Sequence, residues 1–280
     1  MNILFWNAGM SKTRAKNFEN VTNCIHELLL ENSVDLLILA EYPYDIQNLC
    51  QTSNTISHMQ YKPIPNNEGC KRIRGIINYK YNIDIVREQS NYQIAKIKTS
   101  LYDMIVAMFH GRSKTRSSGE TQAMGISHFY NDIVIEEQKF TSAYTIAIGD
   151  FNVNPFETAC IGASGIHAIP FRDAVECKST RQIFGREYQK FYNPTWKLFG
   201  NTEAPYTTYY RDNSGEDVNF YWYALDQVLI RPSLIKAFDE KSLKVISQTR
   251  NHCLMKNGKP DKLNYSDHLP LLCALKEDLM

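Results

Sequence analysis

Apolar runs that end in an acidic, amide or imidazole side chain recur along this chain of 280 residues. Such runs of aliphatic and β-branched residues, each followed by turn residues, are typical of buried strands. The runs lead to Asn7, Glu41, His110, Asp150 and the Ser-Asp-His sequence that ends at His268. A further run, residues 224–230, carries Asp226 among apolar residues, where a charge is costly unless it is paired. We expect these polar groups to converge on one site, so the chain is predicted to form a single domain over residues 1–280.

The run at residues 143–152 contains the most suggestive pair. Ile146 and Ile148 alternate as in a buried strand, and Gly149 is predicted to let the backbone turn. Asp150 and Asn152 follow two residues apart, and in an extended segment such residues point the same way. A carboxylate beside an amide suits the holding and deprotonation of a water or hydroxyl. The alternative is an Asx turn that caps the strand, because Asp and Asn are ordinary turn residues.

The whole set resembles the endonuclease/exonuclease/phosphatase superfamily, the DNase I-like metal-dependent phosphoesterases. In that family an N-terminal strand ends in Asn and a second strand ends in Glu. A His, a G-D-x-N sequence, an Asp before an apolar strand and an S-D-H sequence then follow. All six occur here in that order, from residue 7 to residue 268. The resemblance implies an α/β fold: a four-layer sandwich of two mainly antiparallel β-sheets, packed face to face, with helices on both outer sides. Periodicity alone predicts only mixed helices and strands.

Glu41 is the expected metal ligand. It ends the most apolar run in the chain, where a carboxylate must be paired or bound to a cation. Carboxylate and water oxygens suit Mg²⁺, with Mn²⁺ as a substitute. The resemblance places the family's metal-binding Glu at this position, and Asn7 and Asp267 at positions that complete or border the metal shell. Without the resemblance, Glu41 could be an exposed strand-end residue and Asn7 an ordinary turn residue.

The resemblance also implies the catalytic roles. Asp150 falls at the position of the water-activating Asp, and Asn152 at that of the Asn that orients it. His268 would donate to a phosphate oxygen while a carboxylate holds it protonated, and its family partner falls at Asp226. The alternative for Asp226 is a structural hydrogen bond to a loop. His110 matches the second histidine of the DNase-like and phosphatase branches. The abasic-site endonuclease branch has Tyr there, which argues against that repair activity.

Two segments have open interpretations. Arg112, Lys114 and Arg116 lie in the polar loop that follows His110, and they are predicted either to bind substrate phosphates or to be a solvated loop. The segment 181–211 is rich in Tyr, Phe and Trp. It could be core under a long loop or a rim on which bases stack.

The remaining pattern predicts a helix that begins near Ser11 or Thr13 and stops at Asn32. Antiparallel strands are expected within residues 73–97, and a second helix ends near residue 139. Pro155 suggests a helix that begins at residues 154–157. The last strand is expected at residues 269–275.

The composition constrains the cellular location and the partners of the protein more than it constrains the reaction. A net charge of +1 gives no global basic field, so any attraction for phosphates must be local. Seven cysteines without a CxxC pair argue against a zinc site and a disulfide framework. No apolar run approaches the roughly 20 residues that span a bilayer, and Met1 leads directly into the first strand. We therefore expect a soluble cytoplasmic protein that does not bind membranes.

The sequence thus predicts a divalent-metal phosphodiesterase that hydrolyses nucleic acid, DNA in preference to RNA, by in-line attack of a water. One alternative is a phosphatase or phosphodiesterase for a small-molecule or lipid head-group phosphate ester. Another is a non-catalytic binding module on the same fold, which the intact set of polar residues makes a poor fit.

Overall fold

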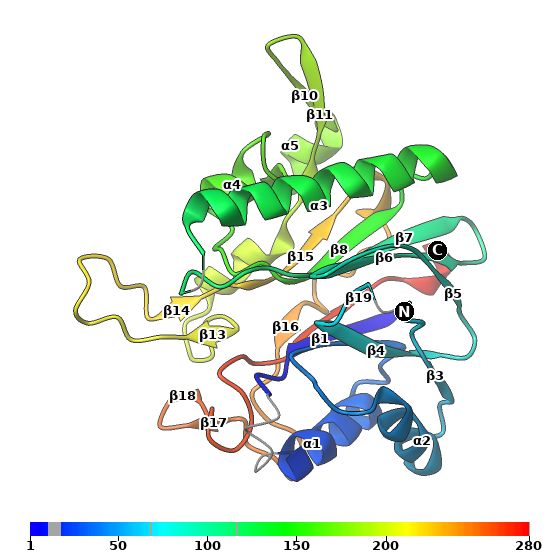
Figure 1. Cartoon of the computed structure of the whole chain (residues 1–280), viewed down its shortest axis with the longest axis vertical. Helices are drawn as coiled ribbons and strands as arrows, with labels where there is room; N and C mark the ends of the chain where they lie inside the picture. The colour runs from blue at the N-terminus through cyan, green and yellow to red at the C-terminus, as the bar shows by residue number, and fades with distance from the viewer. Residues whose placement is uncertain (11–17, 68, 116, 280) are drawn as a thin grey trace.

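Two β-sheets pack face to face in the computed structural model, which describes residues 1–10, 18–67, 69–115 and 117–279. Helices α1 and α2 cover the outer face of one sheet, and α3, α4 and α5 lie on the outer side of the other (Figure 1). The four-layer α/β sandwich predicted from the sequence is confirmed. Both sheets are mixed, because each contains parallel as well as antiparallel pairs.

The first sheet has six strands in the order β16-β19-β1-β2-β4-β3. Their bounds are β1 (Asn2–Asn7), β2 (Leu36–Ala40), β3 (Tyr61–Pro63), β4 (Ile73–Asn78), β16 (Lys244–Val245) and β19 (Leu271–Ala274). Strands β1 and β2 are parallel and are connected through α1 (Phe18–Glu31). The helix buries one apolar stripe that includes Val21, Ile25 and Leu28. Helix α2 (Ile46–Ile56) follows β2.

The second sheet has seven strands in the order β5-β6-β7-β8-β15-β12-β9. Their bounds are β5 (Asn82–Gln89), β6 (Tyr92–Lys98), β7 (Asp103–His110), β8 (Thr145–Asp150), β9 (Ala168–Ile169), β12 (Phe191–Tyr192) and β15 (Asp226–Ile230). Strands β7 and β8 are parallel, connected through α3 (Gly119–Phe140). The shorter helices are α4 (Thr158–Ile161) and α5 (Arg172–Cys177).

Three hairpins extend from the sandwich: β10 (Thr180–Ile183) with β11 (Arg186–Gln189), β13 (Tyr209–Tyr210) with β14 (Trp222–Tyr223), and β17 (Met255–Lys256) with β18 (Lys259–Pro260). Short 3₁₀ helices occupy Pro194–Gly200, Pro232–Leu234 and Glu277–Leu279. The β10–β11 hairpin projects well beyond the helices (Figure 1).

The core between the sheets is buried and mainly aliphatic. It contains Phe5 and Ile38 of the first sheet and Val106, Ile148 and Val228 of the second. Burial of side chains of this size stabilises the fold by about 1.5–3 kcal/mol each. Register then places the polar residues: Asp150 pairs with His110 on one side and with Asp226 on the other. Three candidate site residues are therefore neighbours in one sheet.

Two sequence predictions about backbone geometry are wrong. Gly149 does not open a turn but lies inside β8, where a Cβ would come within 1.9 Å of the Phe109 carbonyl oxygen. Glycine is needed there because β7 and β8 approach closely. No helix begins at residues 154–157. Asn154 instead forms a turn in which its N–H donates to Glu157 Oε1 at 2.7 Å, and α4 begins at Thr158.

Helix boundaries elsewhere agree with the sequence in part. The expected start near Ser11 or Thr13 lies outside the described residues, and α1 is described from Phe18. Helix α2 was not predicted, because its buried face consists of Leu49, Cys50 and Ser53, of which only Leu49 is a large aliphatic residue. Across the described ranges, no helix is both long and apolar enough to traverse a bilayer.

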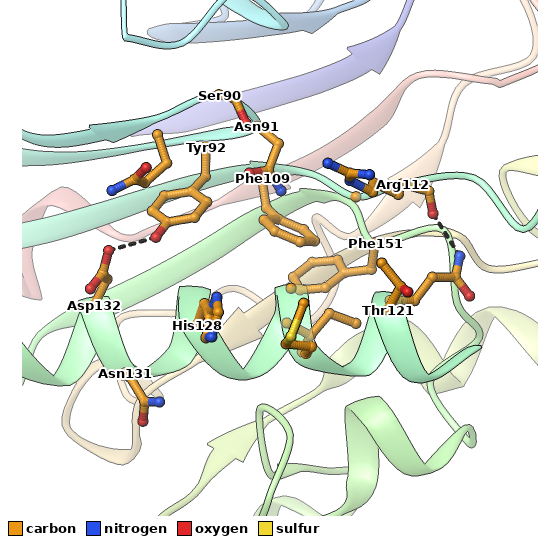
Figure 2. Close-up of a pocket in the computed structure, with 16 residues that line it drawn as sticks. Ser90, Asn91, Tyr92, Phe109, Arg112, Thr121, His128, Asn131, Asp132 and Phe151 are labelled. Carbon is orange, nitrogen blue, oxygen red and sulfur yellow. Dashed lines mark hydrogen bonds between the residues drawn. The ribbon is translucent and has the colours of Figure 1, made fainter. Parts of the chain in front are cut away.

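A cavity of ≈ 530 Å³ lies between α3 and the turn that joins β5 to β6 (Figure 2). A second cavity, of ≈ 680 Å³, lies at the end of the sandwich where the polar strand ends meet.

Candidate active site

The cavity of ≈ 680 Å³ collects nearly all of the side chains singled out in the sequence. Those that line it are Asn7, Glu41, His110, Arg112, Lys114, Asp150, Asn152, Asp267 and His268. Asp226 is fully buried behind them. Arg116 lies outside the described residues. Both sheets contribute, since Asn7 ends β1, Glu41 follows β2, and His110 and Asp150 end β7 and β8.

Asp150 is 1% exposed and accepts three hydrogen bonds. Asn7 Nδ2 donates to its Oδ2 at 2.9 Å, as does Asn152 Nδ2 at 2.9 Å. The backbone N–H of Asn152 donates to its Oδ1 at 2.8 Å, which closes an Asx turn. Asn152 has a φ of 54°, so the expected extended segment is wrong and the turn is correct. The turn itself brings the amide onto the carboxylate.

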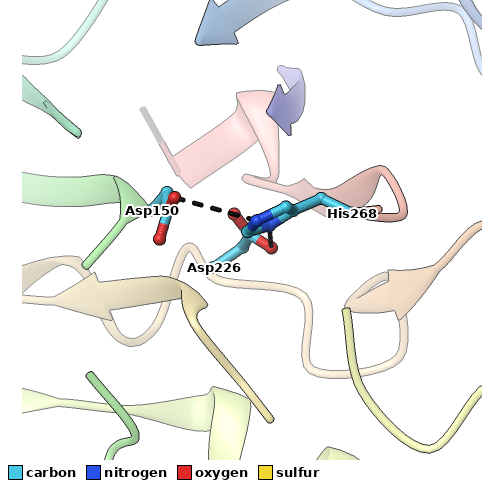
Figure 3. Close-up of side chains that lie close together, drawn as sticks. All are labelled: Asp150, Asp226 and His268. Carbon is cyan, nitrogen blue, oxygen red and sulfur yellow. Dashed lines mark hydrogen bonds and ion pairs between the residues drawn. The ribbon is translucent and has the colours of Figure 1, made fainter. Parts of the chain in front are cut away.

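His268 lies between two carboxylates (Figure 3). Its Nδ1 is 2.8 Å from Asp226 Oδ2, and its Nε2 is 4.0 Å from Asp150 Oδ2. Burial opposes a charge on the ring, but the charge and hydrogen bond of Asp226, together with Asp150, raise the pKa of His268 to about 10. The imidazole is therefore protonated at neutral pH, with both nitrogens as donors.

The Ser-Asp-His sequence is fixed to β1 by Ser266. Its hydroxyl donates to the Asn7 carbonyl oxygen at 2.7 Å and accepts from the His268 backbone N–H at 3.0 Å. Trp6 Nε1 donates to the His268 carbonyl oxygen at 2.9 Å. These contacts hold His268 in place from the first sheet, while Asp226 approaches it from the second.

Burial also raises the pKa of Asp150, to about 6, an effect that Asp226 reinforces and that His268 and His110 oppose. A carboxylate with a pKa close to 6 is ionised at neutral pH yet more basic than a solvated Asp. The ring of His110 is also close to this carboxylate, with its Nε2 3.7 Å from Asp150 Oδ2.

Glu41 faces the same histidine. Its Oε1 is 3.4 Å from His110 Nε2, and a hydrogen bond from that ring lowers the pKa of Glu41 against the opposing effect of desolvation. The backbone at Glu41 is left-handed, with a φ of 49°, and the side chain is 45% exposed. Glu41 is thus an ionised carboxylate that is open to the cavity.

Two groups of side chains could hold a cation. Ligand atoms of Asp150, Asp226 and His268 lie within 4.8 Å of one another. In that group, however, the imidazole is protonated and offers no lone pair, and Asp150 has a single lone-pair site left after it accepts three N–H donors. Glu41 and Asp267, which line the cavity beside Asn7, are oxygen donors of the kind that Mg²⁺ and Mn²⁺ bind. We consider the second group the better fit.

The polar loop that follows His110 agrees only in part with the prediction that its cations bind phosphates. Arg112 lines the cavity, whereas Lys114 Nζ is 2.7 Å from both carboxylate oxygens of Glu157. The charge of Lys114 is therefore already compensated.

Sequence reasoning gave no individual role to Arg211, Asn213 or Tyr223, which line the cavity together with Lys71, Arg72 and Tyr209. The ring of Tyr209 is 4.6 Å from that of His268. The segment 181–211 is thus part core and part rim: Phe191 and Tyr192 are buried, whereas Tyr209 and Arg211 face the cavity. Tyr209 and Arg211 are two residues apart, a spacing that could have indicated side chains on the same face of an extended segment.

Comparison with solved structures supports the assignment of the fold. No protein-family model and no curated protein matches the sequence. Among solved structures, an endonuclease/exonuclease/phosphatase family protein from Bacteroides thetaiotaomicron matches 98% of this chain and 97% of its own, at a TM-score of 0.56 and 10% identity. The chain therefore has the fold of the endonuclease/exonuclease/phosphatase proteins.

Two further structures carry more specific names. An AP endonuclease from Archaeoglobus fulgidus matches with a TM-score of 0.55 and 13% identity, covering 98% of this chain and 99% of its own. D. rerio TDP2, complexed with a single strand DNA product, matches with a TM-score of 0.53 and 18% identity, covering 98% and 97%. At these identities the similarity establishes the fold alone.

Proposed function

We propose that this protein is a divalent-metal-dependent phosphodiesterase that hydrolyses nucleic acid by in-line attack of a water. The observation that carries the proposal is the arrangement of Asp150 and His268. A buried carboxylate poised to accept a proton faces an imidazolium poised to donate one, 4.0 Å apart at the base of an open cavity. Water activation and phosphate stabilisation require groups of these two kinds.

Asp150 takes the proton of the attacking water. Asn7 and Asn152 both donate to Oδ2 and the Asn152 backbone N–H donates to Oδ1, which fixes the carboxylate and leaves one lone pair, on Oδ1, for the water. His268, kept protonated by Asp226, donates from Nε2 to a phosphate oxygen as negative charge develops there. His110 lies on the opposite side of Asp150 and supplies a further donor.

Glu41 and Asp267 would hold the metal, with Asn7 at the border of the shell. When bound, Mg²⁺ or Mn²⁺ supplies positive charge that neutralises the scissile phosphate. Asn7 has a second task, because its Nδ2 positions Asp150 and its Oδ1 accepts from the Gly9 N–H at 3.0 Å.

The rim favours a polynucleotide, with DNA preferred to RNA. Arg72, Arg112 and Arg211 line the cavity and can each meet a phosphate beyond the scissile one. Tyr209 and Tyr223 line it as well and offer rings for stacking. A protein of the same fold holds a single strand DNA product. We further propose that residues 1–280 act as one domain and that the protein works in the cytoplasm, since all seven cysteines are unpaired.

A substrate panel tests the proposal. Plasmid and linear DNA, RNA, phosphoinositides and bis-p-nitrophenyl phosphate would each be assayed with Mg²⁺, Mn²⁺ and EDTA. We expect cleavage of DNA that EDTA abolishes and that Mg²⁺ restores. Turnover of phosphoinositides without cleavage of any polynucleotide would instead identify a phosphatase of small or lipid phosphate esters. Inactivity on every ester would favour a binding module.

A further inference from the structure

The cavity of ≈ 530 Å³ beside α3 is not used by the chemistry described above, yet it adjoins the candidate active site. Gly111 and Arg112 line both cavities, so a strand bound over Asp150 reaches the second cavity by passing Arg112. Figure 2 shows Arg112 at one end of this cavity, with Asn91 and Tyr92 on one side and Thr121 and His128 of α3 on the other.

The lining suits a neutral group that is rich in hydrogen-bonding atoms. Gln89 ends β5, Ser90 and Asn91 form the β5–β6 turn, and Thr121 and Asn131 lie on α3. These side chains can donate and accept hydrogen bonds without carrying a charge.

The acidic and basic side chains that line the cavity are Arg112 and Asp132 at its ends and His128 on α3, and they decide where a charged group can be bound. Asp132 lines it but is already engaged, since Tyr92 Oη donates to Oδ2 at 2.5 Å and Arg87 contacts Oδ1 at 3.2 Å. Among the described lining residues, Arg112 is the one guanidinium or ammonium group. A phosphate therefore fits at Arg112, at the junction, and a neutral group fits beyond it.

Gly125 supplies an independent observation. It lies in the interior of α3, where glycine lowers helix stability relative to alanine. A Cβ at this position would meet no atom within 4 Å, so packing against the protein does not require glycine. Its bare backbone borders the cavity, next to Met124, which is exposed. A flat group could lie against the backbone here, with the Met124 thioether beside it.

We infer that this cavity binds a nucleobase of the substrate strand, with the adjoining phosphate on Arg112. The inference rests on the proposed nuclease function and adds a base subsite on the α3 side of the scissile phosphate. Base contacts at such a site are tolerant of sequence, because amides and hydroxyls can pair with any base edge.

The test combines changes in protein and ligand. Binding of a fluorescent single-stranded oligonucleotide is measured in the Asp150→Asn background, which prevents cleavage. A single abasic nucleotide is then moved through the oligonucleotide one position at a time. With glycine at 125, one abasic position should weaken binding by about tenfold, the usual scale of one base contact. Gly125→Phe, which fills the cavity, should bind the intact oligonucleotide about tenfold more weakly and show no further loss at that abasic position.

Gly119→Phe is the matched control. It adds the same side chain to the same helix at a position that lines neither cavity and where a Cβ meets no atom within 4 Å, so it should keep the abasic penalty. Gly125→Leu is a second, smaller filling variant, and circular dichroism checks that both filled variants are folded.

The inference fails if the filled variants bind as tightly as the control, or if every abasic penalty is the same with and without the filling side chain. In that case the wild type still cleaves DNA, and the proposed function stands. If the wild type neither binds nor cleaves oligonucleotides, the proposed function and the subsite fall together.

Discussion

At the scale of single residues, the site depends on Asp150, a carboxylate whose burial makes ionisation costly. Burial raises the pKa of Asp150 to about 6, above its value of 3.8 in water, so the fold gains stability from its protonation below pH 3.8. That gain is lost as the pH rises through 6. At neutral pH the ionised form is destabilising, and the three N–H donors only partly offset its burial. A buried ionisable residue that costs stability in this way is a candidate functional residue.

Asp150→Asn should therefore remove activity without harming the fold. The loss of a general base costs on the order of 10²–10⁴ in rate. At pH 8 the variant should unfold at a temperature no lower than the wild type, because a buried charge has gone. Activity on DNA and thermal unfolding are the two measurements. Activity within tenfold of wild type, in a folded variant, would show that Asp150 is not the base.

Asp226→Asn should change the pH dependence of the reaction. Burial disfavours the charge on His268, but Asp226, together with Asp150 and Asp267, raises its pKa from 6.5 to about 10. The stabilisation from this charge is therefore fully present below pH 6.5 and is lost as the pH rises through 10. In the wild type, activity should rise near pH 6 as Asp150 ionises and persist to near pH 10. The variant should lose activity well below pH 10, because burial then lowers the pKa of His268. An alkaline limb at the same pH in both proteins would contradict this role.

Glu41→Gln should weaken the binding of the metal and leave the general base, Asp150, intact. We expect a higher Mg²⁺ concentration for half-maximal activity and partial rescue by excess Mg²⁺, since an amide is a poorer ligand than a carboxylate. The comparison is a pair of Mg²⁺ titrations. An inactive variant whose residual activity follows the wild-type titration curve would rule out Glu41 as a ligand.

At the scale of elements, the close contact of β7 and β8 is the feature most sensitive to mutation. Gly149→Ala would place a methyl carbon 1.9 Å from the Phe109 carbonyl oxygen, so the strands must separate. We expect a loss of at least about 3 kcal/mol in the free energy of unfolding, a loss characteristic of severe overpacking. Gly125→Ala is the control, with a gain of up to about 1 kcal/mol. Urea unfolding measures both, and equal stabilities would mean that the two strands can move apart freely.

The strands that carry the site were predictable because each is a local run with its polar residue at the end. The cost of a lone charge in an apolar strand indicated that Asp226 has a partner, and the family resemblance implied that the partner is His268. What could not be predicted depends on contacts between distant segments. Tyr209 belongs to a strand of two residues, and it forms a direct antiparallel β-bridge with His268, which is distant in the sequence. The need for Gly149 is likewise visible only once β7 lies beside it.

At the scale of the whole molecule, the charges are local. The net charge is +1, while Lys71, Arg72, Arg112 and Arg211 gather around one cavity. Binding of DNA should therefore depend on salt through a few phosphate contacts.

Arg112→Ala and Arg211→Ala should each reduce the slope of log binding constant against log salt by about one. Hydrolysis of bis-p-nitrophenyl phosphate should change little, because a small ester has no neighbouring phosphate. Lys114→Ala is the control, since Glu157 already neutralises that charge. Fluorescence titrations at several salt concentrations give the slopes. Equal slopes for the wild type and all three variants would mean that the DNA strand does not contact Arg112 or Arg211.

The register of the second sheet has a practical consequence for work with this protein. His110, Asp150 and Asp226 are partners across three adjacent strands, and a slip of β8 by one residue would turn Asp150 toward the opposite face. A chain that regains its secondary structure with that slip would have normal circular dichroism and no catalytic centre. Recovered turnover after dilution from denaturant therefore counts correctly aligned molecules, and the spectroscopic yield minus the enzymatic yield measures the misaligned fraction.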